Sequence, residues 1–188
     1  MIISFGGNAG SGKSTIAKML ADKLGWPRYY IGGLRRQKAA ERGLTLAEYN
    51  KLGETDPATD FEVDEYQKEL AKGEDNFVIE GRTSWYFIPQ SLKIFLDADP
   101  DVAAQRILSD MQSNNQRNEG NASTLAEIKA IAKERKESDT KRYRHYYDID
   151  VFDPKNFDFT LDTSNLTPDE VFSIIYEFVQ SKLERVDK

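Results

Sequence analysis

The sequence predicts a three-layer α/β fold, in which a five-stranded parallel sheet lies between flanking helices. Two observations carry this prediction. Short apolar runs of strand length alternate with longer segments of helical periodicity, as in sheets built from β-α-β units. The first run, residues 1–5, leads into a glycine-rich turn that opens the first helix. The 188 residues are enough to bury one such core, and we expect residues 1–188 to form a single domain.

The expected strands are apolar runs bounded by polar or turn-forming residues. They comprise residues 1–5, 28–31, 76–80, 92–96 and 159–162. The third run ends in an acid, Glu80. Because the carboxyl ends of parallel strands meet at one edge of a sheet, residues at these ends are candidates for a site.

Helices are expected between the strands and after the last one. They comprise residues 14–24, 33–41, a short helix opened by the capping box at 45–48, and residues 60–72, 100–111, 124–146 and from 167 onward. Two helical excursions leave the sheet, at residues 33–74 and 112–147. Residues 112–123 are polar and rich in Asn and Gln, so we expect them to form a mobile loop.

Composition excludes several classes of function. The net charge of -6 disfavours general nucleic-acid binding, which needs a basic face. The absence of cysteine excludes disulfides, thiolate metal sites and cysteine nucleophiles. No apolar stretch approaches the roughly 18 residues of a membrane span, and the N-terminal run is expected to be a core strand, not a signal peptide. We therefore expect a cytoplasmic enzyme with no membrane partner.

The glycine-rich turn after the first strand matches the Walker A pattern G-x-x-x-x-G-K-S. Its glycines let the backbone wrap around phosphate oxygens, and the helix that follows contributes the positive end of its dipole. Lys13 is expected to reach the β- and γ-phosphates. The expected ATP-binding residues are Gly7, Asn8, Ala9, Gly10, Ser11, Gly12, Lys13, Ser14 and Thr15.

ATP implies Mg²⁺ as the cofactor, and two residues are candidates to hold it. The Ser14 hydroxyl follows the P-loop lysine, the position that ligates Mg²⁺ in such loops. Glu80 is the candidate second acid, as in a Walker B strand. Asp97 and Asp99, after the fourth strand, are the alternatives.

Phosphoryl transfer requires positioning and charge neutralisation, so arginines near strand ends are candidates for catalysis. Arg82 follows the third strand. Arg36 lies early in the helix that is expected after the second strand. Arg135 and Arg142 lie seven residues apart on the long helix and share a face, with Asp139 between them. With Lys13, the arginines Arg82, Arg135 and Arg142 would form a clamp around the transferred group. The alternative for each arginine is an ordinary solvated or salt-bridged side chain.

One predicted helix carries a polar face. Asp60, Asp64 and Gln67 fall at positions i, i+4 and i+7. Their donors and acceptors could recognise a nucleobase edge, and a solvated helix face is the alternative. If an acceptor base lies beside this helix, a carboxylate there would favour cytosine over uracil, because cytosine offers an amino group where uracil has a carbonyl.

These residues together resemble the cytidylate kinase family, in its short archaeal-type branch of the nucleoside monophosphate kinases. The resemblance covers nearly the whole chain. Beyond the phosphate loop it rests on Gly32, Arg36 and Glu41-Arg42-Gly43; Asp60, Asp64 and Gln67; Glu80-Gly81-Arg82; Arg135, Asp139, Lys141-Arg142-Tyr143 and Tyr147-Asp148-Ile149-Asp150; and Asp162-Thr163-Ser164.

The resemblance implies a P-loop NTPase fold, ATP as donor, and CMP or dCMP as acceptor. It implies that Arg36 and Arg82 bind the acceptor phosphate and that Arg135 and Arg142 close over the transferred group. The acceptor-binding residues are expected to be Gly32, Arg36, Asp60, Asp64, Gln67, Arg82 and Asp139. The chain departs from the branch at Glu65-Tyr66, where two basic residues are usual, and at Asp110, where the family often has arginine.

The predicted function is therefore ATP-dependent phosphorylation of a pyrimidine nucleoside monophosphate. Two alternatives remain at this point. One is a kinase for another small acceptor, such as AMP, UMP or a nucleoside. The other is a regulatory nucleotide-binding ATPase, although the sequence lacks the N-K-x-D motif of a GTPase switch.

Overall fold

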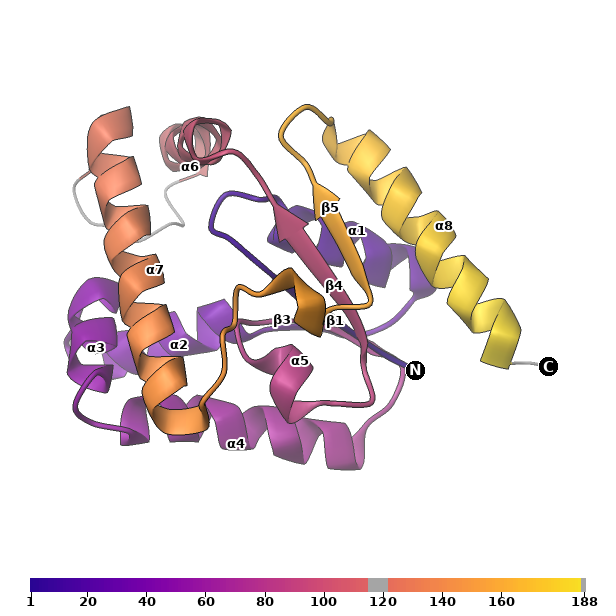
Figure 1. The fold of residues 1–188 in the computed structure, drawn as a ribbon, viewed down its shortest axis with the longest axis horizontal. Coiled ribbons are helices and arrows are strands. Elements are labelled where there is room, and N and C mark those ends of the chain that lie inside the picture. The colour runs from indigo at the N-terminus through magenta and orange to yellow at the C-terminus, as the bar shows by residue number, and fades with distance from the viewer. Residues whose placement is uncertain (115–121, 187–188) are drawn as a thin grey trace.

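A computed structural model describes residues 1–114 and 122–186 and shows a single sheet of five parallel strands (Figure 1). The strands are β1 (Ile2–Gly7), β2 (Arg28–Tyr30), β3 (Phe77–Glu80), β4 (Leu92–Asp97) and β5 (Phe159–Asp162), in the spatial order β2-β3-β1-β4-β5. In the centre, Phe5 of β1 is in register with Glu80 of β3, and Gly7 with Leu96 of β4. The predicted fold class is confirmed.

Helices cover both faces of this sheet. They are α1 (Lys13–Leu24), α2 (Ile31–Glu41), α3 (Leu46–Gly53), α4 (Ala58–Gly73), α5 (Ser84–Phe87), α6 (Pro100–Asn114), α7 (Leu125–Tyr147) and α8 (Pro168–Val186), with a 3₁₀ turn at Pro154–Asn156. Figure 1 shows α1 and α8 on one side of the sheet and α4 and α5 on the other.

The two faces have separate apolar cores because β1 is buried on both sides. Ile3 and Phe5 pack with α1 and α8, whereas Ile2 packs with Ile31 of α2 and Val63 of α4. A strand enclosed in this way is apolar at successive positions, which is why β1 was recognisable as a run. The arrangement leaves the carboxyl ends of β1 and β3 side by side at one edge of the sheet.

Several boundaries differ from the prediction. Helix α2 begins at Ile31 instead of Gly33, so Gly32 also lies in its first turn. The short helix α5 between β3 and β4 was not predicted, and α6 continues to Asn114. The polar segment predicted as a mobile loop is thus helical at residues 112–114, while residues 115–121 lie outside the described part of the chain. Among the residues described, no helix combines the length and apolarity of a membrane span.

Candidate active site

The phosphate loop joins β1 to α1 and owes its shape to two glycines. Gly7 and Gly10 have φ angles of 129° and 76°, in the region that favours glycine. A Cβ at Gly7 would lie 1.9 Å from the Leu96 carbonyl oxygen, and one at Gly10 would lie 2.5 Å from that of Ala103. The backbone therefore approaches its neighbours more closely than any side chain permits. Lys13 lies across the loop, with its Nζ donating to the Asn8 carbonyl at 2.5 Å.

A cavity of about 440 Å³ opens above this loop. Residues 9–15 form one wall, so the N-terminus of α1 faces the cavity. Residues of seven other elements, β2, β3, α2, α4, α6, α7 and α8, complete it. Of the predicted residues outside the loop, Gly32, Arg36, Asp60, Asp64, Glu80, Arg82, Arg135 and Asp139 line it. Four predicted residues lie outside its wall: Gly7, Asn8, Gln67 and Arg142.

The predicted magnesium ligands meet at the edge of the cavity. The Ser14 hydroxyl donates to Glu80 Oε2 at 2.5 Å, and Glu80 Oε1 accepts from Arg28 Nε at 2.8 Å. A hydroxyl and a carboxylate are oxygen ligands of the kind that Mg²⁺ binds together with substrate phosphates, so these two residues fit the ion. The alternatives have other partners: Asp97 accepts from Asn8 Nδ2, and Asp99 accepts from the backbone N–H of Asp101 at the start of α6.

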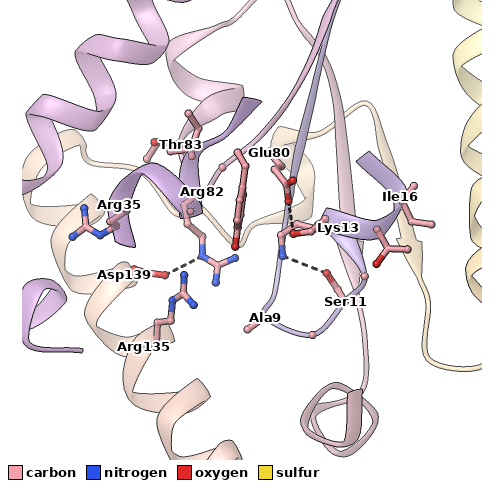
Figure 2. A pocket seen from close by; sticks show the side chains of 18 of the residues that line it. Ala9, Ser11, Lys13, Ile16, Arg35, Glu80, Arg82, Thr83, Arg135 and Asp139 are labelled. Atoms are coloured by element: carbon pink, nitrogen blue, oxygen red, sulfur yellow. Dashed lines mark hydrogen bonds and ion pairs between the residues drawn. The ribbon is translucent and has the colours of Figure 1, made fainter. Parts of the chain in front are cut away.

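Three cations face the centre of the cavity. Figure 2 shows the guanidinium groups of Arg82 and Arg135 directed into the space beside Lys13. Arg82 is held from behind, because its Nε donates to Asp139 Oδ2 at 2.9 Å and its Nη1 donates to the Gly7 carbonyl. Burial alone would raise the pKa of Asp139, but the charges of Arg142, Arg82 and Arg135 lower it to about 2. Asp139 therefore stays ionised and orients Arg82.

Arg142 lies apart from the other predicted catalytic residues. Its side chain is fully buried behind the cavity, with Nη1 donating to Asp60 Oδ1 and Nη2 donating to Asp139 Oδ1 at 2.5 Å. Arg135 lies two turns earlier on α7 and does reach the cavity. In this arrangement Arg142 does not line the cavity, and its closure over the transferred phosphoryl group stays a prediction. Its geometry is that of a buried counter-ion for two carboxylates.

The polar face of α4 is buried, so the alternative of a solvated face is wrong. Asp60, Asp64 and Gln67 are each at most 3% exposed. Asp60 Oδ1 accepts from Arg35 Nη1 at 2.8 Å as well as from Arg142. Asp64 Oδ2 accepts from the Tyr147 hydroxyl at 2.6 Å. These carboxylates join α4 to α2 and α7 at the wall of the cavity.

Arg35 is a cavity residue that the sequence analysis missed. It is buried, and its Nε donates to Asn50 Oδ1 at 2.8 Å. Its spacing could have indicated that it is buried. Ile31, Arg35 and Ala39 lie at i, i+4 and i+8 and form the buried face of α2. The predicted residue Arg36, next to it, bonds to the Gly32 carbonyl at 3.1 Å and to the Tyr30 hydroxyl.

The far end of the cavity, beyond the phosphate loop, is also formed by residues outside the predicted set. Arg106 of α6 donates to the Thr163 hydroxyl at 2.9 Å and to the Thr163 carbonyl at 2.7 Å. Thr163 in turn donates to the Ser11 carbonyl at 3.1 Å. Arg106, Asp110, Thr163 and Leu166 all line this end. The segment after β5 thus connects the phosphate loop to α6.

Comparison with known proteins finds relatives that match nearly the whole chain. Residues 2–165 match the cytidylate kinase-like family. The cytidylate kinase of Halobacterium salinarum is 37% identical over 183 residues, which cover 96% of this chain and 90% of that protein. The cytidylate kinase of Pyrococcus furiosus is 40% identical over 176 residues, which cover 93% and 86%.

Solved structures support the fold. Shikimate kinase from Bacteroides thetaiotaomicron superposes with a TM-score of 0.65 at 16% identity, covering 96% of this chain and 98% of that one. An uncharacterized protein from Eubacterium ventriosum gives 0.66 at 20% identity, covering 96% and 99%. The sequence matches, which extend over nearly the full length, identify the family: the chain belongs to the cytidylate kinase-like family.

Proposed function

We propose that the protein transfers the γ-phosphoryl group of ATP to the phosphate of CMP or dCMP, giving ADP and CDP or dCDP. Family membership makes the protein a nucleoside monophosphate kinase, and the named relatives support cytidylate as the acceptor. The observation that carries the proposal is a single cavity with a phosphate loop at one side and Arg36, Arg82 and Arg135 at the other. Mg²⁺ as cofactor and a cytoplasmic setting belong to the same proposal.

The donor side of the cavity is suited to a nucleoside triphosphate. Residues 10–15 and the start of α1 would surround the phosphates with backbone N–H groups and a helix N-terminus. Lys13 would leave the Asn8 carbonyl to neutralise charge on the β–γ bridging oxygen as that oxygen departs. Ser14 and Glu80 would hold Mg²⁺, which when bound supplies further charge neutralisation for the phosphates.

The acceptor side is suited to a second phosphate. An oxygen of the CMP phosphate forms the new bond to the γ-phosphorus while the bond from that phosphorus to the β–γ bridging oxygen breaks. Arg82 would orient the attacking phosphate, and Asp139 holds Arg82 Nε so that the guanidinium is in place beforehand. Arg135 would stabilise the equatorial oxygens of the transferred group, where charge is spread in the transition state.

The proposal is tested by coupled assay of ADP release with ATP, Mg²⁺ and a panel of CMP, dCMP, UMP, AMP and cytidine. We expect kcat/KM for CMP or dCMP to exceed that for UMP and AMP by at least about tenfold, or about 1.4 kcal/mol. Hydrolysis of ATP without acceptor should be far slower, since phosphoryl transfer to water is a side reaction of the open site. Equal use of UMP or AMP, or ADP release independent of acceptor, would contradict it.

A further inference from the structure

The segment that follows α7 brings an aromatic ring to Arg82. The Cζ atom of Arg82 lies over the ring of Phe152, 5.2 Å from its centroid. A guanidinium within about 6 Å of a ring centroid is attracted by the negative face of the ring. Arg82 lines the cavity, whereas Phe152 does not. Any influence of Phe152 on a molecule in the cavity therefore passes through Arg82.

The contacts of Arg82 leave one end of its guanidinium for a ligand. Its Nε donates to Asp139 Oδ2 at 2.9 Å, and its Nη1 donates to the Gly7 carbonyl. The attraction to the Phe152 ring acts on the charge of the whole group and needs no hydrogen-bond acceptor. Nη2 makes no hydrogen bond with any residue that the structure describes. Arg82 is thus restrained at three places while the N–H groups of Nη2 remain for an anion in the cavity.

Phe152 is itself fixed by the turn in which it lies. Asp150 Oδ1 accepts from the backbone N–H of Phe152 at 3.0 Å, and the Asp150 carbonyl accepts from Asn156 Nδ2 at 3.0 Å. An aspartate that bonds to the backbone two residues later stabilises a turn in this way. Val151, between the two, is 1% exposed and anchors the turn in the protein. The motif Tyr147-Asp148-Ile149-Asp150 therefore ends in the residue that holds the ring.

A second cation also contacts the ring. Lys136 of α7 places Nζ 4.9 Å from the centroid of Phe152. Lys136 is exposed and does not line the cavity, whereas the side chain of Arg82 is only 14% exposed. A cation removed from water gains more from an aromatic ring than a solvated one does. The contact with Arg82 is therefore the one that can influence the cavity.

We propose that Phe152 is a positioning residue for phosphoryl transfer, whose ring holds Arg82 in the orientation in which Nη2 meets the acceptor phosphate. The inference rests on the proposed function, since it places that phosphate at Arg82. Asp139 and the Gly7 carbonyl restrain two nitrogens, and the ring restrains the guanidinium as a whole. A side chain that is ordered before the ligand arrives loses less entropy on binding, so the ring should strengthen use of the acceptor.

The test compares Phe152→Leu, which keeps an apolar side chain but removes the ring, with Phe152→Tyr, which keeps the ring. We expect Phe152→Leu to lower kcat/KM for CMP about 5- to 10-fold, mainly through KM for CMP. The KM for ATP should change less than about twofold, because Arg82 serves the acceptor. Phe152→Tyr should retain kcat/KM for CMP within about twofold of wild type. If Phe152→Leu does not fold, Phe152→Met also lacks the ring and replaces it.

The matched control is Phe178→Leu in α8. Lys182 Nζ lies 5.2 Å from the centroid of Phe178, the same distance as in the contact of Arg82 with Phe152, and neither Phe178 nor Lys182 lines the cavity. The ring of Phe178 also stacks on Phe159 with the centroids 4.5 Å apart. Its loss should lower Tm but leave KM for CMP and KM for ATP within about twofold of wild type.

A double-mutant cycle decides whether Phe152 acts through Arg82. In an Arg82→Ala background, Phe152→Leu should change kcat/KM for CMP by less than about twofold, because the group that it orients is gone. The same loss in both backgrounds, a parallel rise in KM for CMP and for ATP, or failure of Phe152→Tyr to retain activity would overturn the inference. If the wild-type enzyme uses another nucleoside monophosphate and not CMP, the proposed function fails, and the cycle is measured with the acceptor that is used.

Discussion

Replacing Arg142 with methionine tests whether this residue maintains the fold or stabilises the transition state. Methionine keeps much of the apolar stem but removes the guanidinium that contacts Asp60 and Asp139. Both carboxylates are at most 2% exposed, so each is left buried with one partner fewer. Breaking a buried ion pair from one side costs about 3–5 kcal/mol.

The lower end of that range applies to Arg142→Met because each carboxylate keeps another arginine. Asp60 retains Arg35, and Asp139 retains Arg82. A loss of about 3 kcal/mol corresponds to a fall of about 6–12 °C in Tm for a domain of this size. We would measure Tm by differential scanning calorimetry and the free energy of unfolding by urea titration, both without nucleotide.

The matched control is Arg144→Met on the same helix. Arg144 is 64% exposed and pairs with Asp150 at 3.2 Å, and such surface pairs contribute at most about 1 kcal/mol. The structural role of Arg142 would be refuted if the Tm of Arg142→Met equals that of Arg144→Met while its kcat falls about 10²-fold or more. Arg142 would then act on the phosphoryl group, as the spacing on α7 predicts from sequence.

Four further predictions concern the cavity. Lys13→Ala should lower kcat about 10²- to 10³-fold, or about 3–4 kcal/mol, with little change in Tm; near-normal turnover would exclude its role at the γ-phosphate. Arg82→Ala should raise KM for the acceptor far more than KM for ATP. Arg82→Lys should not restore the wild-type KM for the acceptor, because an ammonium cannot replace a guanidinium fork. Arg135→Ala should reduce kcat with modest change in nucleotide affinity by calorimetry; the reverse pattern would make Arg135 a binding residue only. The pKa of Asp64 is raised from 3.8 to about 6 on folding, mainly by burial, so the unfolded chain loses this proton first. The contribution of Asp64 to the free energy of unfolding should therefore fall by about 3 kcal/mol as pH rises from about 4 to 6, and then level off. Urea titrations of wild type and Asp64→Asn over that range should differ by this amount, and parallel pH curves would contradict the assignment.

The parts of the fold that depend on local sequence could be predicted. The phosphate loop is set by glycines within eight residues, and β1 is apolar at successive positions because both of its faces are covered. The order β2-β3-β1-β4-β5 could not be predicted, since strand neighbours are chosen by packing between distant segments. The early start of α2 is also non-local in origin, because Ile31 is drawn into the core formed by Ile2, Val63 and Phe77.

The polar face of α4 shows why part of the site was ambiguous. Spacing placed Asp60, Asp64 and Gln67 together, but periodicity is the same for a solvated face and for a buried one. What makes the face buried is its partners: Arg35 lies 25 residues before Asp60, and Tyr147 lies 83 residues after Asp64. Only the fold brings those donors to the helix, so the different partners of the two carboxylates could be identified only from the structure.

The difference between Arg135 and Arg142 follows from the geometry of α7. Seven residues return a helix to nearly the same angle, which is why the sequence predicted equal roles, but they also advance about 10 Å along its axis. That advance separates Arg135, which lines the cavity, from Arg142, which is buried beside Asp60. Five residues further on, Tyr147 reaches Asp64. Because Arg135 and Tyr147 belong to the same helix, a displacement of α7 that withdraws Arg135 from the cavity would also break the hydrogen bond from the Tyr147 hydroxyl to Asp64.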